Sequence, residues 1–336
     1  MSEVQSNRKR AGRPAWFMEL KHYAKADAGK STWQLINTLL PYLILWAVMI
    51  LLLRAGFSFW LLLPLTVLAG GFLIRIFIIF HDCCHGSFYK SRSANRIAGY
   101  ITGILTFTPF EQWRKSHTIH HATVANLDRR GVGDVWTMTV EEFRQADPLQ
   151  RFLYRIVRTP VFTFLIGPPL MFFFVQRLAS KDAGRAERNS VIITNLALAG
   201  ILALAHFTIG LRTYALIQLP TMYVASVAGV WLFYVQHQFE GVYWARQGDW
   251  NPIRASLDGS SYYQLPAVLQ WFTGSIGFHH LHHLNPRIPN YRLEAAYRSV
   301  PEVHVQPLTL RGSLRSLRLN LYDEERKQMV SFRHFQ

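Results

Sequence analysis

The apolar stretch Phe57–Phe80, FSFWLLLPLTVLAGGFLIRIFIIF, runs directly into the polar stretch His81-Asp82-Cys83-Cys84-His85. The apolar part exceeds the roughly 20 residues that a helix needs to cross a bilayer. In the polar part, two imidazoles stand four residues apart, and on a helix this spacing puts them on one face. The sequence therefore predicts a membrane helix that ends in a pair of histidines.

Three further runs have a similar length and composition: Leu35–Leu53, Val191–Ile209 and Thr213–Gln236. Only residues 54–56 separate Leu35–Leu53 from Phe57–Phe80, and only residues 210–212 separate Val191–Ile209 from Thr213–Gln236. We therefore expect two hairpins, each of which returns to the side of the membrane from which it starts. Together the four spans predict an all-α integral membrane protein.

The composition agrees with a membrane protein and excludes several other classes. Of the 336 residues, 50% are hydrophobic and 17% are charged, whereas soluble domains average about 25% charged residues. Fourteen histidines stand against two cysteines, Cys83 and Cys84, which excludes a disulfide framework and a cysteine-rich zinc domain. We interpret the two cysteines as small packing residues.

Two apolar segments do not fit a simple membrane crossing. Residues 160–175 contain Gly167-Pro168-Pro169, which we expect to break a helix, and arginines and lysines flank this segment on both sides. Residues 94–109 carry isoleucines at helical spacing. We predict that both segments are re-entrant or interfacial elements.

Charge sets the expected orientation, because lysine and arginine concentrate on the cytoplasmic side of membrane proteins. The net charge is +16, and residues 1–30 and 301–336 are both basic. We predict a membrane-embedded domain of residues 31–300 with a large cytoplasmic cap, between a basic N-terminal segment and a basic C-terminal tail that are both cytoplasmic. We expect a bacterial cytoplasmic membrane as the location and no nucleic acid as a partner.

Most of the histidines fall in four places that this topology puts on the cytoplasmic side. One is an HxxxH pattern, two are HxxHH patterns, and one is a lone histidine after the last span. Histidines three or four residues apart share a helix face, which selects nine imidazoles: His81, His85, His117, His120, His121, His237, His279, His282 and His283. We leave out His280, which falls off the face of its neighbours, and His206, which lies near the other end of its span.

Nine neutral imidazoles are too many for one metal ion. A zinc ion takes four ligands, whereas iron takes up to six and is well suited to imidazole. Two iron ions with four or five histidines each fit the number. The remaining ring nitrogens need hydrogen-bond acceptors, and the candidate carboxylates nearby in sequence are Asp82, Glu111, Asp134 and Glu240.

The three histidine boxes, in their order and their positions relative to the hairpins, resemble those of the integral-membrane fatty acid desaturases. The resemblance runs from about Trp33 to Leu293 and is closest to the branch of delta-12 and omega-3 acyl-lipid desaturases. Three stretches carry it: His81–Phe88, Gly103–Asp134 and Phe233–Trp244. It implies that the nine histidines bind two irons, that dioxygen is a cosubstrate, and that a cis double bond is inserted into an acyl chain.

One position departs from the animal acyl-CoA desaturases, which carry asparagine four residues before the isolated histidine. Here that position is Phe233, and this difference favours the acyl-lipid branch. The His-Pro-Gly-Gly pattern of a fused cytochrome does not occur. We therefore expect the electrons to come from a separate donor, such as a ferredoxin or a cytochrome.

The chemistry that the resemblance implies demands precise placement of the substrate. An unactivated methylene has no acidic proton and no leaving group, so the metal site must supply the reactivity, and the protein must place one carbon pair beside it. This needs a narrow apolar tunnel. Aromatic residues next to the boxes are candidates for its walls, with ordinary packing as the alternative for each: Phe107, Phe110, Trp113, Trp271, Phe272 and Phe278.

Six arginines follow the third box, and three uses of this basic surface stay open. It could hold the anionic headgroups of membrane lipids, or it could bind an acidic electron donor. It could also be a solvated positive face with no specific partner. The arginines are Arg287, Arg292, Arg298, Arg311, Arg315 and Arg318.

Other functions remain as alternatives. Hydroxylation of an acyl chain or lipid uses the same scaffold, and the motifs do not distinguish it from desaturation. A membrane haem protein would leave most of the histidines unexplained, since haem takes two axial ligands. A metal transporter would need polar groups inside its spans, and these spans are nearly free of them. The bond position and the acyl carrier, whether a membrane lipid or an acyl thioester, also stay open.

Overall fold

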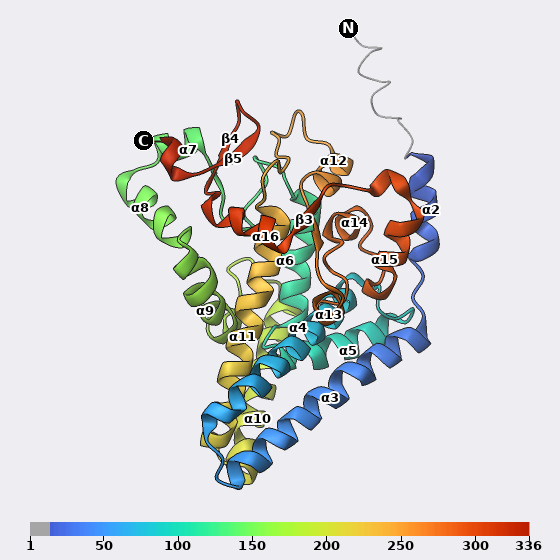
Figure 1. Ribbon diagram of the computed structural model, residues 1–336, viewed down its shortest axis with the longest axis vertical. Coiled ribbons are helices and arrows are strands. Elements are labelled where there is room, and N and C mark those ends of the chain that lie inside the picture. Colours follow the sequence, from blue (N-terminus) through green and yellow to red (C-terminus); the bar gives the residue numbers. More distant parts are fainter. Residues whose placement is uncertain (1–13, 336) are drawn as a thin grey trace.

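The computed structural model describes residues 14–335 as a bundle of long helices beneath a cap (Figure 1). Within this range, four helices are long and apolar enough to cross a membrane. They are α3 (Ala28–Arg54), α4 (Leu63–His85, preceded by the 3₁₀ turn η2, Phe59–Leu62), α10 (Arg185–Thr208) and α11 (Leu211–His237). They contain nearly all of the four predicted runs, although α3 and α10 begin seven and six residues earlier than predicted. The predicted helical membrane fold is therefore confirmed.

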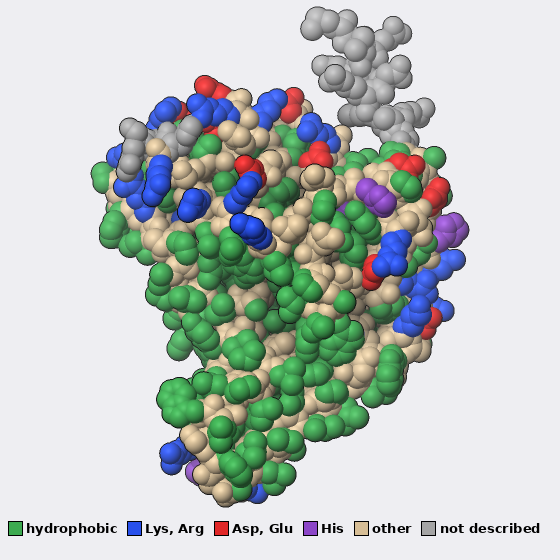
Figure 2. Space-filling model, viewed as in Figure 1, with side chains coloured by type: hydrophobic (Ala, Val, Ile, Leu, Met, Phe, Trp, Pro, Cys, Tyr) green, Lys and Arg blue, Asp and Glu red, His purple; other side chains and the backbone are tan. Residues whose placement is uncertain are grey.

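The turns that join the paired helices lie at the same end of the bundle. Arg54 at the end of α3 donates from its Nη2 to the carbonyl oxygen of Thr208 at the end of α10, over 2.9 Å. Figure 1 shows the four helices meeting at this lower end, and Figure 2 shows hydrophobic side chains covering the lower part of the molecule. The opposite ends of α4 and α11 therefore reach toward the cap.

Helices α4 and α11 pack closely at the centre of the bundle. A Cβ atom on Gly70 would lie 2.7 Å from Cγ1 of Val224, so only glycine allows this approach of the two helices. Both helices continue to a histidine, His85 in α4 and His237 in α11. The packing of α4 against α11 thus fixes the separation of two elements of the candidate site.

The one ionisable side chain inside the apolar part of α4, Arg75, is held by polar partners. It is 7% exposed, and its Nε donates to Oγ1 of Thr38 over 3.1 Å. Its Nη1 donates to the carbonyl oxygen of Trp271, and the guanidinium lies 4.0 Å from the centre of the Trp271 ring. These contacts stabilise a buried positive charge in the bundle and connect α3 and α4 to the segment before the third box.

The cap comprises α2 (Ala15–Tyr23), residues 86–160 and residues 238–335. Its helices that carry or support the site are α5 (Arg92–Leu105), α6 (Phe110–Thr123), α12 (Pro252–Leu257), α13 (Ala267–Phe272), α14 (His279–Leu284) and α15 (Asn290–Ser299). The segment predicted at residues 94–109 is α5 and the turn after it. Ile97 and Ile101 of α5 are exposed, while Gly99 and Gly103 face Phe110 and Phe80. Its position at a membrane interface stays a prediction.

The segment around residues 160–175 is helical but bent. It forms α8 (Pro148–Val157), η3 (Val161–Ile166), α9 (Gly167–Phe173) and η4 (Val175–Arg177), with a bend of 61° between Pro148–Val157 and Val161–Arg177. The expected break at Gly167-Pro168-Pro169 is wrong. Because η3 is a π-helical turn, the Gly167 N–H reaches the carbonyl of Phe162, and the prolines enter in the first turn of α9, where their missing N–H groups cost no hydrogen bond.

Two small sheets in the cap were not predicted. One has the strand order β1-β4-β5, with β1 (Met138–Thr139) parallel to β4 (Leu321–Asp323) and β4 antiparallel to β5 (Gln328–Val330). The other pairs β2 (Tyr262–Gln264) in parallel with β3 (Pro307–Thr309). Helix α7 (Val140–Gln145) follows β1. Residues 301–335 also form η5 (Pro301–Val303), α16 (Leu310–Ser313), η6 (Leu314–Arg318) and η7 (Phe332–Phe335). Instead of the expected tail, the C-terminal residues fold into the cap.

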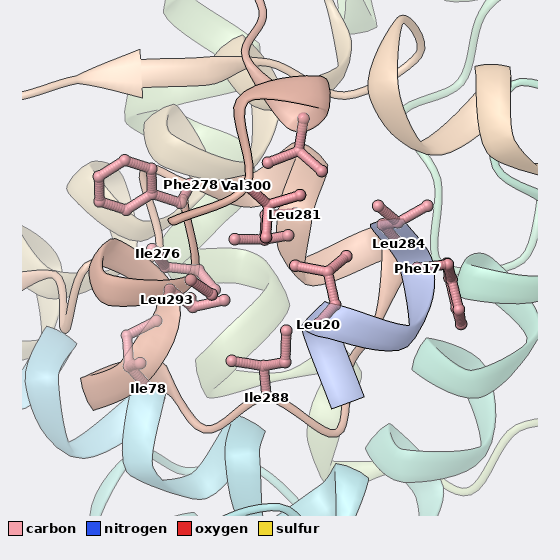
Figure 3. Packing of buried hydrophobic residues seen from close by; sticks show 12 residues of the cluster. Phe17, Leu20, Ile78, Ile276, Phe278, Leu281, Leu284, Ile288, Leu293 and Val300 are labelled. Atoms are coloured by element: carbon pink, nitrogen blue, oxygen red, sulfur yellow. The ribbon is translucent and has the colours of Figure 1, made fainter. Parts of the chain in front are cut away.

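A buried cluster in the cap packs the N-terminal helix against the third box (Figure 3). Phe17 and Leu20 of α2 lie in one cluster with Leu281 and Leu284 of α14 and with Ile78 of α4. Leu20 and Leu281 have no exposed surface. The short helix α14 would not be stable alone, so this packing holds it against the end of α4.

Candidate metal centre

The first histidine box occupies the last two turns of α4. The helix ends at Gly86, whose φ of 65° is left-handed and suits glycine. The rings of His81 and His85 have centroids 4.8 Å apart. The membrane helix itself therefore aims both imidazoles into the cap.

The second box lies on α6, which crosses beside α4. His117, His120 and His121 share one side of this helix, and the ring of Trp113, one turn earlier, stacks on His117 with 4.2 Å between centroids. The ring of His117 lies 4.8 Å from that of His81. The second box therefore faces the first.

The lone histidine and the third box complete the arrangement. His237 is the last residue of α11, and α14 consists of little more than the third box itself. His237 Nε2 lies 3.0 Å from His279 Nε2. His282 Nε2 lies 3.0 Å from His121 Nε2, so α14 contacts both α11 and α6.

The nine predicted imidazoles converge in two groups whose ligand atoms lie within 4.8 Å of one another. The five-histidine group is His81, His85, His117, His121 and His282, and the four-histidine group is His120, His237, His279 and His283. The groups touch, since the rings of His121 and His283 stack with centroids 4.1 Å apart. The structure thus brings together every histidine that the sequence analysis selected.

The distances between ring nitrogens fit ligands of a shared ion. An imidazole nitrogen lies about 2.1 Å from a bound transition metal, so two such nitrogens are about 3.0 Å apart at a right angle and about 3.4 Å apart at the tetrahedral angle. The Nε2 atoms of His117 and His121 are 3.1 Å apart, as are those of His279 and His283. These separations favour right angles, as in octahedral geometry, over a tetrahedron.

The tautomers at the four-histidine group also require a cation. Nδ1 of His120 lies 2.5 Å from the carboxylate of Asp134, and Nδ1 of His237 lies 3.4 Å from the carbonyl oxygen of Gly259. Both partners only accept hydrogen bonds, so both Nδ1 atoms carry the proton. The two Nε2 atoms then present lone pairs to each other over 3.2 Å, an arrangement that is repulsive unless a positive ion lies between them.

Burial keeps the rings in the form that binds metal. Desolvation lowers the pKa values of His117 and His121 well below the ordinary value, and neighbouring histidines lower them further. The same causes lower the pKa values of His279, His282 and His283. In the five-histidine group, Nε2 of His85 is buried without a hydrogen-bond partner. Neutral, desolvated imidazoles with free nitrogens fit a metal site.

Of the four candidate carboxylates, two reach the imidazoles. Asp82 lies 3.2 Å from Nδ1 of His81, and Asp134, which also accepts from the Gly131 N–H over 2.9 Å, holds His120. The expectation for Glu240 is wrong, because the chain turns outward after α11 and this exposed carboxylate pairs with Arg315. Glu111 is buried but pairs with Arg114.

The histidines that were left out lie apart from the two groups. Nε2 of His280 lies 3.1 Å from the carbonyl oxygen of Val303, and burial lowers the pKa of His280 to about 4. His206 contacts Phe207 near the end of α10. His304 stacks on Tyr297, and the side chain of His334 lies outside the described part of the structure.

Comparison with known proteins agrees with this geometry. The model of the fatty acid desaturase family matches residues 58–307, a range that contains all nine histidines. The chain belongs to the fatty acid desaturase family. A protein of Bacillus subtilis (strain 168) named fatty acid desaturase is 46% identical over 312 residues, which cover 93% of this chain and 88% of that protein.

More distant members of the family carry more specific names. The sn-1 oleoyl-lipid 12-desaturase of Synechocystis sp. is 27% identical over 72% of this chain and 69% of its own length. The sn-1 acyl-lipid omega-3 desaturase (ferredoxin) of the same organism is 26% identical over 75% of this chain and 70% of its own length. This desaturase therefore has both delta-12 and omega-3 acyl-lipid desaturases among its relatives, as the resemblance of its histidine boxes implies.

The aromatic candidates for a tunnel wall fall into two kinds in this desaturase. Phe278 stacks on Tyr262, and Phe110 packs against Phe80. Both are buried in hydrophobic clusters, so core packing accounts for them. By contrast, Trp113 touches the ring of His81 and is only half-buried.

The other three candidates pack against helices α4 and α9. Phe107 packs against Phe173 and has a positive φ of 57°. Trp271 lies edge-on to Phe272, and both pack against Phe72 of α4. Phe107 and Phe272 both pack against the hydrophobic cluster formed by α3, α4 and α11.

Two residues that support the first box were not predicted from the sequence. Asn290 at the start of α15 donates its backbone N–H and its Nδ2 to Asp82 over 2.7 and 2.9 Å. Gln34 of α3 donates to Oδ1 of Asn290 over 2.8 Å. A polar glutamine directly before the predicted span Leu35–Leu53 was the available signal, but its partner lies far away in the sequence.

Proposed function

We propose that this chain inserts a cis double bond into the acyl chain of a membrane lipid, at a site that holds two iron ions. The observation that carries the proposal is the convergence of nine imidazoles into two touching groups at the ends of two membrane helices. Membership of the fatty acid desaturase family supports the reaction type.

Iron fits the two groups better than zinc does. Groups of five and four histidines exceed the three protein ligands of a catalytic zinc, and nitrogen separations near 3 Å favour right angles. Imidazole suits iron, and because iron takes up to six ligands, groups of five and four histidines would leave ligand positions free. Bound iron would supply the oxidising chemistry with dioxygen that an unactivated C–H bond requires.

The protein's own residues orient and isolate the metal ligands. Asp82 and Asp134 hold the protons of His81 and His120 at Nδ1, so that Nε2 of each ring is free to bind metal. The ring of Trp113 covers one face of His117. Eight of the nine rings lie on helices α4, α6 and α14. Seven of the nine histidines are buried, which limits the access of bulk water and thus side reactions at the site.

The acyl chain must lie beside the metal ions with one carbon pair in place. We propose that Trp113, Phe107 and Trp271 belong to the wall of the acyl tunnel. The names of the Synechocystis relatives support an acyl-lipid substrate, desaturation at the delta-12 position and an electron carrier such as a ferredoxin.

The orientation follows from charge. Lysine and arginine gather on the cap, whereas the surface of the four spans is apolar (Figure 2). By the positive-inside rule, we propose that the cap and both termini are cytoplasmic and that the chain lies in a bacterial cytoplasmic membrane.

Expression in a host that lacks polyunsaturated lipids tests the function. Mass spectrometry of fatty acid derivatives should show a new double bond in lipids of cells that express the chain. His120→Ala should abolish this product and lower the iron bound per chain. His206→Ala, a matched histidine at the far end of α10, should change neither. A hydroxylated product, or an unchanged product from His120→Ala, would contradict the proposal.

A further inference from the structure

A basic cleft opens in the cap next to the first histidine box. It has a volume of about 1160 Å³ and lies between the connection from α2 to α3, the end of α4, and the first turns of α5 and α6. Arg287 and Arg292, which follow the third box, complete its wall. Figure 2 shows basic side chains gathered on this side of the molecule, near α2 and α15.

Positive charge in the cleft exceeds what its own carboxylates neutralise. Two carboxylates line it, and both are already engaged: Glu111 with Arg96 and Arg114, and Asp27 with Arg292 over 3.9 Å. The remaining basic side chains are exposed and form no ion pair with a carboxylate in the described range: Lys25, Lys90, Arg92 and Arg287. An anionic partner would therefore be attracted by these four positive charges and would not need to break an internal ion pair.

The cleft leads to the five-histidine group. His85 lines it together with Cys84 and Gly86, and the ring of His85 is partly exposed. Its Nε2 is buried without a partner and belongs to the five-histidine group. Only one imidazole ring therefore separates the cleft from the place where a metal ion would bind, which gives an electron a short path to the site.

The chemistry of the cleft favours a water-soluble partner over a lipid surface. Surfaces that lie on lipid combine basic residues with exposed large apolar side chains. Helix α8 has this pattern, with exposed Phe152 and Leu153 beside Arg151 and Arg155. The cleft lacks it, because none of its lining residues is an exposed large hydrophobic residue.

We propose that this basic cleft is the docking surface for an acidic one-electron carrier protein. The proposal rests on the proposed function, in which the carrier supplies the electrons for desaturation. One saturated carbon pair, one dioxygen, two electrons and two protons give one cis double bond and two waters. Two reduced carriers, each of which loses one electron, balance the reaction. Opposite charges on the two proteins would speed the encounter and fix its orientation.

Lys90→Glu with Arg92→Glu tests the proposal. Neither side chain forms an ion pair with a described carboxylate, and an acidic residue at the first position of α5 suits the helix dipole, so the fold should persist. Arg311→Glu with Arg318→Glu is the matched control, since it makes the same charge change at two exposed arginines outside the cleft, near exposed Leu310 and Leu314.

The measurement is the Kd of the full chain, in lipid nanodiscs of neutral phosphatidylcholine, for a purified acidic [2Fe–2S] ferredoxin. At about 50 mM salt, the cleft variant should bind at least about tenfold more weakly than the wild type, and the difference should shrink at high salt. The control variant should bind like the wild type. Equal binding by the cleft variant, or an equal loss in both variants, would overturn the proposal.

Two further readouts separate this proposal from its alternatives. If the cleft variant keeps its ferredoxin affinity but loses binding to phosphatidylglycerol vesicles, the cleft is a lipid-headgroup site and the docking proposal is wrong. The products of the wild type with reduced ferredoxin and dioxygen test the reaction separately. Cleft-dependent ferredoxin binding without a new double bond would refute the proposed desaturation and leave the docking surface standing.

Discussion

The side chain of Asn290 holds the carboxylate of Asp82 in place beside the first histidine box. Nδ2 of Asn290 lies 2.9 Å from Oδ2 of Asp82, and the other carboxylate oxygen faces Nδ1 of His81 over 3.2 Å. Asn290 is 1% exposed and Asp82 is equally buried. A residue that follows the third box therefore fixes the orientation of a ring in the first.

Asn290→Leu should weaken metal binding. The substitution leaves a buried carboxylate with fewer donors and leaves Gln34 without its acceptor, which costs about 1–3 kcal/mol of stability. Loss of such outer contacts typically lowers metal affinity about 10–100-fold. Iron per purified chain, titrated against a chelator, measures this effect.

Asn195→Leu is the control for that measurement. Asn195 also exchanges two hydrogen bonds with another segment, through Arg177, but it touches no histidine of either group. This variant should lose stability without losing iron affinity. If both variants retain iron like the wild type, Asn290 does not act through Asp82.

Asp134→Asn should impair the four-histidine group. The amide can present its N–H₂ to Nδ1 of His120 and then stabilises the tautomer with the proton on Nε2, where the metal should bind. We expect a loss of activity of about 10–100-fold together with a fall in bound iron. Glu240→Gln is the control, because it makes the same chemical change on an exposed carboxylate paired with Arg315. It should leave activity and bound iron unchanged. An equal loss in this variant would show that Asp134 does not act through His120.

The periodicity of the sequence was sufficient to predict the spans and the nine histidines, because both depend on local patterns. Run length identifies a membrane helix, and spacing of three or four residues identifies a shared helix face. The exclusion of His280 follows from the same rule, and its ring indeed turns toward Val303.

Features that depend on distant contacts were missed or wrongly predicted. Asn290 is an ordinary residue at the start of a helix until folding brings it against Asp82, 208 positions away. Glu240 is close to His237 in sequence, but the turn after α11 carries its side chain to the surface. The strands at residues 307–330 are only three residues long and gain their stability from partners in the cap, so no local pattern reveals them.

Acidic pH should release metal and destabilise the protein. Burial lowers the pKa values of His117, His121, His279, His282 and His283 in the folded state. Below the unfolded value of about 6.5, the unfolded chain then binds more protons than the folded chain, so stability falls as the pH drops. Protons also compete with metal for the ring nitrogens.

The thermal midpoint and the bound iron, measured between pH 8 and pH 5, check this expectation. Both should be flat above about pH 7 and should fall below about pH 6.5. Protein from which a chelator has removed the metal should still show the fall in thermal midpoint, without the part that comes from loss of iron. A midpoint that rises toward pH 5 would show that the buried rings are charged in the folded state.

Gly103 should be intolerant of even a methyl group. A Cβ atom at this position of α5 would lie 2.6 Å from the carbonyl oxygen of Thr108 and 2.9 Å from the ring of Phe80, so the backbone before the second box would have to move. Overpacking of this kind costs about 1–3 kcal/mol, and displacement of α6 would also lower activity. Gly200→Ala in α10, where nothing lies within 4 Å of the new atom, should instead be neutral or stabilising by up to about 1 kcal/mol. The temperature at which half of the detergent-solubilised protein aggregates distinguishes the two variants, and equal values for both would show that α5 adapts without strain.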